Sequence, residues 1–186
     1  MKKINKTRYA ILGMLLEKSQ SGYDIKRMMA QSTTHFWQES DASIYPMLKT
    51  LEDEKKVKSR SEFIGKRERR IFEITASGKK EFTTWMALPT ESGTTRNELL
   101  LKLFFGANTT KEEIIKHLNT ELAKCQEIKK QFKELENNIL SNVSNSYPHK
   151  IYWEMALGNG VLSIETELKW LKKCIQKLEG NGKDLS

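Results

Sequence analysis

The segment from Ser40 to Glu54, SDASIYPMLKTLEDE, limits what this chain can fold into more than any other segment. As a helix it aligns apolar side chains at positions i, i+3, i+4 and i+7 of one face, namely Ile44, Met47, Leu48 and Leu51. The opposite face carries Ala42, Tyr45, Pro46 and Lys49. One face therefore requires a hydrophobic core. The other face is small, aromatic and cationic, and it suits the groove of a polyanion better than open solvent.

Pro46 limits where this helix can begin. Proline is tolerated near a helix start, because only the N–H groups of the opening turn lack an intrahelical partner. Asp41 or Ser43 could cap that turn. We therefore expect the helix to begin close to Asp41.

Two short helices are predicted before this segment. The first covers residues 7–17 and the second residues 23–29, and Ser21 with Asp24 resembles an acidic variant of the capping box at the start of the second. These helices and the one that begins near Asp41 make three helices in the first part of the chain.

The pattern changes after Glu54. Residues 57–64 alternate loosely between polar and apolar, and residues 70–75, RIFEIT, are rich in β-branched and aromatic side chains, so we expect a β-hairpin with a basic tip. Thr75 can cap a fourth helix. Three helices, a hairpin and a further helix follow the order of a winged helix-turn-helix domain.

Three segments carry a family resemblance: SGYDIKRMM (21–29), ASIYPMLKTLEDE (42–54) and GKRERRIFEITASGKKEF (65–82). In order and spacing they resemble the N-terminal domain of PadR-type bacterial transcriptional regulators, including Ser-Ile-Tyr-Pro in the third helix and Thr-x-x-Gly after the hairpin. The resemblance covers residues 8–86. Lys56 departs from it, because the family commonly has glycine there, and we expect a less sharp helix end.

The positive charge lies mostly in the N-terminal half. Residues 1–88 contain 18 Lys and Arg against 11 Asp and Glu, whereas residues 89–186 contain 14 against 13. This asymmetry indicates a nucleic-acid-facing module joined to a neutral one, although a basic membrane-surface face would give the same balance. We predict a winged helix-turn-helix DNA-binding domain over 1–88 and an α-helical dimerisation and effector domain over 89–186.

We predict contacts with double-stranded DNA from the third helix and from the hairpin tip. Ser43, Tyr45 and Lys49 would enter the major groove. Flanking phosphates or the minor groove would meet the cations of the tip, which are Lys66, Arg67, Arg69 and Arg70. Two other interpretations remain open: Tyr45 as a half-buried ring packed on its own domain, and the basic tip as a solvated turn.

In the C-terminal half, capping boxes and apolar spacing predict three further helices. Thr95 with Glu98, and Thr110 with Glu113, fit capping boxes, so helices should start near residues 96 and 111. The first, NELLLKLFFG, is apolar on nearly all sides and should be buried. The second should run over residues 111–143.

The last helix should begin near Tyr152 and carry an apolar stripe with a spacing close to 3.5 residues. Its members include Leu157, Val161, Ile164, Leu168, Leu171 and Ile175. Such a seam is typical of helices that wrap each other, and we interpret it as a dimerisation seam. ELLLKLFFG and ELKWLKKCI also resemble the C-terminal domain of the long-chain PadR subfamily, similar to that of virulence activators, which implies a homodimer held by these helices.

A transcriptional regulator usually responds to a signal, such as the binding of a small-molecule effector. The resemblance permits a small aromatic or lipophilic effector, for which Tyr152, Trp153 and Trp170 are candidates. Gly158 and Gly160 weaken the last helix by roughly 1 kcal/mol each, which indicates a close backbone approach across the dimer or a break beside a cavity. Interface packing of this aromatic side of the helix is the other interpretation.

The sequence offers no metal, cofactor or catalytic constellation. His35, His117 and His149 lie far apart without metal-ligand spacing. Two isolated cysteines, Cys125 and Cys174, fit packing positions on helices, and they favour a reducing cytoplasm over a disulfide framework.

We therefore expect a mainly α, cytoplasmic, homodimeric repressor that reads an inverted-repeat operator and is neither an enzyme nor a membrane protein. The first alternative is a winged-helix adaptor that binds a protein partner and no DNA. The second is a helical protein that uses its basic face on a membrane surface.

Overall fold

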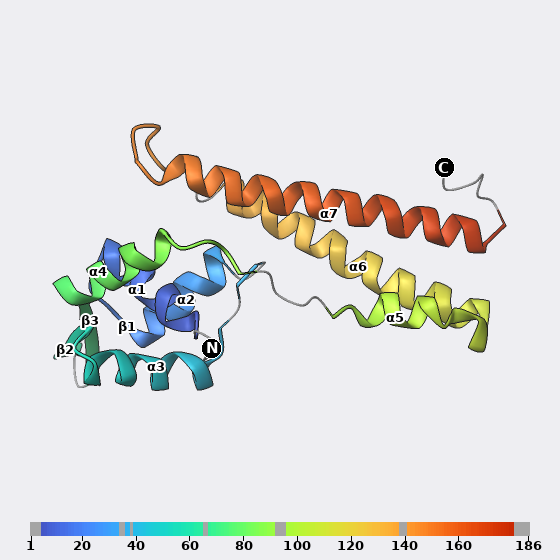
Figure 1. Cartoon of the computed structure of the whole chain (residues 1–186). Coiled ribbons are helices and arrows are strands. Elements are labelled where there is room, and N and C mark those ends of the chain that lie inside the picture. Colours follow the sequence, from blue (N-terminus) through green and yellow to red (C-terminus); the bar gives the residue numbers. More distant parts are fainter. Residues whose placement is uncertain are drawn as a thin grey trace. The chain divides into compact units, whose positions relative to one another are not determined.

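The computed structural model describes residues 5–33, 36–37, 39–64, 67–91, 96–137 and 141–180. The chain divides into two compact units, Met1–Ser92 and Gly93–Ser186, whose elements are labelled in Figure 1. The first unit contains α1 (Thr7–Glu17), β1 (Gln20–Ser21), α2 (Gly22–Ser32), α3 (Asp41–Asp53), β2 (Val57–Ile64), β3 (Arg67–Ile74) and α4 (Ala76–Met86). The second contains α5 (Glu98–Phe104), the 3₁₀ turn η1 (Gly106–Asn108), α6 (Lys111–Leu135) and α7 (Lys150–Leu178).

The first unit is a winged helix-turn-helix fold, as predicted. Its antiparallel sheet has the strand order β1-β3-β2. The β2–β3 hairpin, which we call the wing, pairs from Val57 opposite Ile74 to Ile64 opposite Arg67. The two-residue strand β1 places Ser21 opposite Ile71, so the start of α2 lies at the free edge of β3.

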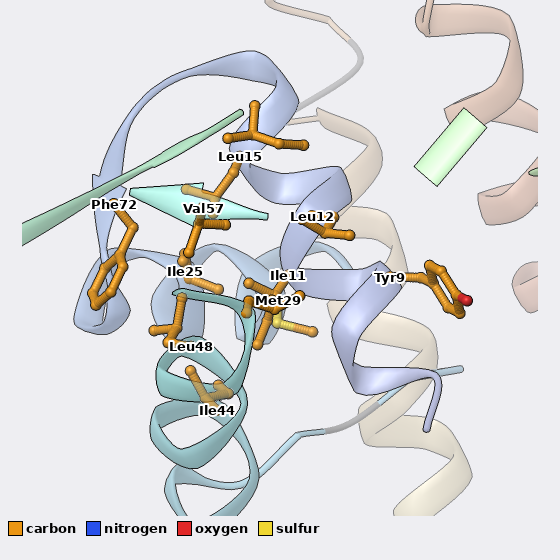
Figure 2. Close-up of a cluster of buried hydrophobic side chains, with 12 residues drawn as sticks. Tyr9, Ile11, Leu12, Leu15, Ile25, Met29, Ile44, Leu48, Val57 and Phe72 are labelled. Carbon is orange, nitrogen blue, oxygen red and sulfur yellow. The ribbon is translucent and has the colours of Figure 1, made fainter. Parts of the chain in front are cut away.

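The core of the first unit collects side chains from its helices and from the wing, as Figure 2 shows. Its fully buried members are Ile11, Leu12, Ile25, Ile44, Leu48 and Leu51, with Val57 from β2. Burying a side chain of this size contributes about 1.5–3 kcal/mol, so this cluster holds α3 firmly on the domain. Tyr9 of α1 stacks on Trp85 of α4 with ring centroids 4.4 Å apart, which attaches α4 to the same core.

The third helix begins at Asp41, as expected, but its cap differs from the prediction. Ser40 occupies the N-cap position and makes no side-chain cap hydrogen bond. Pro46 lies in the second turn, so it deprives the exposed Ala42 carbonyl of its i+4 partner. The exposed position of Ala42 explains why proline is tolerated there, because water can satisfy that carbonyl.

The end of α3 is sharper than predicted. Lys55 adopts a left-handed backbone with φ of 58°, and the Lys56 N–H donates to the Leu51 carbonyl at 2.7 Å. This is the hydrogen bond of a Schellman motif, formed here without glycine. Glycine is required at position 78, in Thr-x-x-Gly, for a steric reason: a Cβ there would overlap the Lys56 carbonyl oxygen.

The predicted caps of the other helices are mostly confirmed. Ser21 and Asp24 form a reciprocal capping box on α2, and Thr75 and Thr110 accept hydrogen bonds from the N–H groups of Gly78 and Glu113. The start of α5 differs: Asn97 caps it by accepting from Leu100 N–H at 3.0 Å. Thr95 lies outside the described residues.

In the second unit, α6 and α7 form an antiparallel pair. Lys129 of α6 meets Glu165 of α7 at 2.6 Å, and a Cβ on Gly160 would lie 2.5 Å from Phe132 Cζ. Gly160 therefore serves the close approach that the sequence indicated, but within one chain. The cluster between the helices is centred on Ile114, Leu118, Cys125 and Leu171.

Two expectations for the second unit were wrong. The helix predicted over 111–143 ends at Leu135, before a polar stretch of low helix propensity, of which residues 138–140 lie outside the described part. The helix predicted to be buried, α5, packs only Leu99 and Leu103 into the cluster, because α6 covers one side of it. Its other apolar side chains are exposed, and Phe104 is 81% accessible.

Candidate nucleic-acid interface

Helix α3 has one buried face and one outward face. Ile44, Leu48 and Leu51 are at most 1% exposed, and in Figure 2 Ile44 and Leu48 point from α3 into the labelled cluster. On the other face Tyr45 is 50% exposed, and Lys49 is exposed one turn further along. The division of this helix into a core face and a free face is therefore confirmed.

Tyr45 packs on its own domain and still presents part of its ring outward, while its contact with DNA stays a prediction. A Cβ on Gly22, the first residue of α2, would lie 2.7 Å from Tyr45 Cε1, so one edge of the ring packs on the α2 backbone. The rest of the ring faces outward. Because α2 supports the ring from one side, the outward edge of Tyr45 is held in a defined position.

Ser43 is half-buried near the start of α3. Its hydroxyl oxygen lies 3.1 Å from that of the N-cap residue Ser40. The hydroxyl can still accept or donate a further hydrogen bond. A contact from Ser43 to DNA therefore stays a prediction.

Of the four cations predicted for the wing, two can be placed. Lys66 lies outside the described residues, and the side chain of Arg67 is also not described. Arg69 and Arg70 are neighbours on β3, and successive side chains of a strand point to opposite faces of the sheet. These two arginines therefore cannot face one ligand from the same side.

Arg69 contacts the start of α2. Its Nη2 donates to the Ser21 hydroxyl at 2.9 Å and forms an ion pair with Asp24. Asp24 also accepts from the Ser21 N–H in the capping box at 3.3 Å. The guanidinium is thus paired with a carboxylate of its own domain.

Arg70 contacts the end of α3. Its Nη2 donates to Glu52, its Nε donates to the Ser59 hydroxyl at 2.8 Å, and its guanidinium carbon lies 5.3 Å from the centre of the Phe72 ring. The Ser59 hydroxyl donates to the other Glu52 oxygen at 2.6 Å. The phosphate contacts predicted for Arg69 and Arg70 stay predictions, since both arginines already have carboxylate partners.

Sequence reasoning missed the partners of both arginines, which are Ser21 and Asp24 for Arg69, and Glu52 and Ser59 for Arg70. The period of two in β3 would have separated Arg69 from Arg70. No local signal identifies Glu52 and Ser59, because their contact joins α3 to β2 across the tertiary fold.

A second charged network joins α1, the end of α3 and α4. Arg8 forms ion pairs with Glu54 and Glu81, each at 2.6 Å, and Lys56 meets Glu81 at 3.1 Å. The hydrogen bond from Arg8 lowers the pKa of the Glu54 carboxyl. The ionised Glu54 carboxylate therefore stabilises the fold at pH values above the ordinary Glu pKa, and this stabilisation is lost as the pH falls through the lowered pKa.

The effector candidates do not form one site within the chain. Trp153 belongs to an aromatic group with Tyr147 and His149, at centroid distances of 5.4 and 6.4 Å, whereas Trp170 packs against the α6–α7 cluster. With a rise of about 1.5 Å per residue, Trp153 and Trp170 are roughly 26 Å apart along α7. One small molecule cannot touch both in the same chain.

A groove of about 530 Å³ lies elsewhere in the second unit. It is lined by Glu136, Ser141, Lys150, Glu154, Leu157, Gly158, Val161 and Leu162. A Cβ on Gly158 would meet nothing within 4 Å, so the helix surface is open there. None of the three candidate aromatic residues lines this groove.

Much of the predicted dimerisation seam packs inside the chain. Leu171 is fully buried, and Ile164, Leu168 and Ile175 pack on the same cluster with α6. The second helix that this seam requires is therefore supplied by α6. Leu157 and Val161, which are half-buried, line the groove instead.

The histidines and cysteines of the described residues form no metal site. No group of three or more His, Cys, Asp or Glu side chains within this part of the chain could hold a metal ion, and His35 lies outside it. Burial raises the pKa of the Cys125 and Cys174 thiols, which suits a packing role. Within the same residues, no helix is both long enough and apolar enough to cross a membrane.

These features define a winged helix-turn-helix domain followed by a helical domain, and two family models match in the same order. Residues 11–84 match the transcriptional regulator PadR-like family, and residues 95–179 match the virulence activator alpha C-terminal family. The chain is 33% identical over 145 residues to the negative transcriptional regulator PadR of Bacillus subtilis (strain 168), covering 75% of this chain and 72% of that protein. This chain belongs to the PadR-like family of transcriptional regulators.

Solved structures agree with this assignment. Bacillus subtilis PadR in complex with operator DNA superposes with a TM-score of 0.85 and 25% identity, over 95% of this chain and 99% of that chain. Bacillus subtilis PadR in complex with p-coumaric acid superposes with a TM-score of 0.77 and 24% identity, over 94% and 99%. The family resemblance found in the sequence is confirmed.

Proposed function

We propose that this protein is a cytoplasmic, homodimeric repressor that binds an inverted-repeat operator and releases it when a small apolar or phenolic effector binds. The observation that carries the proposal is the outward face of α3, where Tyr45 and Lys49 are exposed while Ile44, Leu48 and Leu51 of the same helix are fully buried. The operator complex and the negative regulation of the Bacillus subtilis relative support it.

The two sides of α3 fit the demands of major-groove reading. The groove of B-DNA, about 12 Å wide, admits one helix, and its base edges offer acceptors to a lysine and an apolar methyl to an aromatic ring. Two copies related by a two-fold axis would place their α3 helices on half-sites about 34 Å apart. This geometry predicts an operator with inverted-repeat symmetry.

Salt dependence of binding to the DNA upstream of the protein's own gene tests the proposal. We expect the affinity to fall by about 100-fold between about 50 and 200 mM salt, which corresponds to about four neutralised phosphates per dimer. Fluorescence anisotropy with a labelled duplex measures it, with a scrambled duplex as control. A flat salt response would contradict phosphate contact.

The dimer proposal rests on apolar side chains that the single chain leaves exposed. On and after α5 they are Leu100, Leu101, Phe104 and Phe105, and on α7 they are Ile151, Tyr152, Met155 and Leu162. Exposed apolar side chains gathered in this way mark association surfaces. We therefore assign the contacts between copies to these two surfaces, with Leu157 and Val161 adjoining the second.

The groove beside Gly158 is the place for the effector in this proposal. Leu157, Val161 and Leu162 give it an apolar wall. Its polar rim carries Glu136, Glu154 and Lys150, and the Lys150 amine meets the Glu154 carboxylate at 3.9 Å. The apolar wall suits the ring of a small aromatic ligand, and p-coumaric acid is such a ligand. The p-coumaric acid complex of Bacillus subtilis PadR supports this choice of ligand class.

Gly158→Leu tests the groove. The added side chain meets no neighbour at its Cβ, so it should fill the groove without disturbing α7. We expect p-coumaric acid to weaken operator binding by the wild type and to leave the variant bound to DNA. Ser163→Leu, an exposed position of α7 outside the groove, is the matched control and should respond like the wild type. An equal response of the Gly158 variant would exclude this site.

A further inference from the structure

The wing is attached to both helices of the helix-turn-helix by two neighbouring arginines. Arg69 leaves one face of β3 and reaches the start of α2, whereas Arg70 leaves the other face and reaches the end of α3. Each guanidinium meets a carboxylate and a hydroxyl. The two side chains contact different helices from opposite faces of β3. Together they therefore restrict the tilt of the wing relative to α2 and α3.

On the α3 side the contact is a closed three-membered network. Arg70 donates to Glu52 and to Ser59, and Ser59 donates to Glu52. The three residues belong to β3, α3 and β2, so both strands of the wing are tied to the last turn of the recognition helix. Only the fork of an arginine can use its Nε and Nη2 on two such partners at once.

On the α2 side the short strand β1 makes the contact possible. It pairs Ser21 with Ile71, and Arg69 lies two residues before Ile71 in the sequence, on the same face of β3. There Arg69 meets the Ser21 hydroxyl and Asp24, the two side chains of the α2 capping box.

We propose that Arg69 and Arg70 are positioning residues, which set the wing relative to α3 so that both can engage one duplex. The inference rests on the proposed DNA-binding function. Arg70 uses Nε and Nη2, and Arg69 uses Nη2, on partners within the domain. Because a carboxylate already offsets the charge of each guanidinium, a phosphate would gain less from a direct contact with either arginine. As positioning residues, Arg69 and Arg70 act on the duplex through their partners.

Glu52→Gln separates the two roles by the sign of its effect. If Glu52 and Arg70 position the wing, the loss of the ion pair lowers operator affinity, by about 3- to 10-fold for residues in direct contact. If Arg70 binds phosphate, removing a nearby negative charge and freeing the guanidinium raises the affinity instead. Either a rise or no change in affinity would overturn the proposal.

A double-mutant cycle between Glu52 and Arg70 gives a second readout. We expect Arg70→Gln to lower affinity as much as Glu52→Gln, and the double variant to be no worse than either single variant. The slope of log affinity against log salt should stay at the wild-type value, whereas a lost phosphate contact would reduce it by about 0.9 per subunit. Additive losses or that shallower slope would overturn the proposal, and Arg70→Lys should recover only part of the affinity.

Arg60→Gln is the matched control in the wing. Arg60 forms ion pairs only with Glu62 and Glu73 among the described residues, both within the hairpin. The effect of Glu52→Gln should therefore persist in the Arg60 variant and vanish in the Arg70 variant.

Folding and the proposed function are checked separately. Such exposed ion pairs contribute at most about 1 kcal/mol, so the variants should stay folded in urea titrations, and Ser59→Ala provides a second way to open the network. Absence of salt-dependent DNA binding by the wild type would refute the proposed function. Wild-type binding that Glu52→Gln leaves intact or strengthens would refute the positioning role alone.

Discussion

Replacing Tyr45 and Lys49 together by alanine should lower the affinity of the protein for its proposed operator by about 30-fold or more. Contacts to base edges contribute about 1–3 kcal/mol each, and 1.4 kcal/mol corresponds to a factor of ten. Tyr45 is 50% exposed and Lys49 is exposed, so their removal leaves the buried stripe of α3 intact. Binding titrations with operator and unrelated duplexes measure the loss.

The control for this prediction is Lys79→Ala together with Lys80→Ala, which removes two exposed side chains from α4. Surface substitutions of this kind change stability by at most about 0.5 kcal/mol, so the α4 variant should unfold near the wild-type urea midpoint. The α3 variant also loses the packing of Tyr45 on Gly22 and should unfold somewhat below it. If the α3 variant binds the operator as tightly as the α4 variant does, the outward face of α3 is not the reading surface.

Replacing Phe104 by glutamate should weaken the proposed homodimer by about 30-fold or more. Phe104 is 81% exposed in the single chain and contacts Phe105 edge to face, with ring centroids 5.0 Å apart. A buried aromatic anchor contributes about 2 kcal/mol or more to an interface, and a carboxylate in its place adds the cost of desolvating a charge. Sedimentation equilibrium of the full chain measures the change.

Gln126→Glu is the matched control for the dimer prediction, because it adds the same single charge at an exposed position of α6. Leu162→Glu tests the second apolar surface, on α7. Wild-type association that survives both Phe104→Glu and Leu162→Glu would show that the copies meet through other residues. A variant with a weakened dimer should also lose operator affinity, since each copy would then hold only one half-site.

The first unit could be predicted because its signals are local. The spacing of Ile44, Leu48 and Leu51 defines a core face without knowledge of the rest of the fold. Ser21 and Thr75 cap helices by bonding N–H groups only three residues away. The strand β1 has two residues and leaves no periodic pattern, so it was missed.

The second unit shows where such signals stop. An apolar stripe such as Ile164, Leu168 and Leu171 indicates that another helix covers it. It does not indicate whether that helix belongs to the same chain or to another copy. The apolar run of α5 indicated burial, yet a helix of 7 residues can place only one side on α6. Which surface of α5 another copy would cover is a property of the assembly.

The candidate site was predicted in part for a similar reason. The outward positions of Tyr45 and Lys49 follow from helical geometry alone. The partners of Arg69 and Arg70 follow from tertiary contacts between the wing and two helices, and a run of cations in a sequence does not show which of them are already paired.

Protection of guanine N7 from methylation tests most directly whether the outward face of α3 reads the major groove. We expect two protected patches whose centres are about 34 Å apart along the duplex, and loss of both in the Tyr45 and Lys49 variant. A bound wild-type protein that leaves every guanine N7 open to methylation in an operator containing guanine would contradict it.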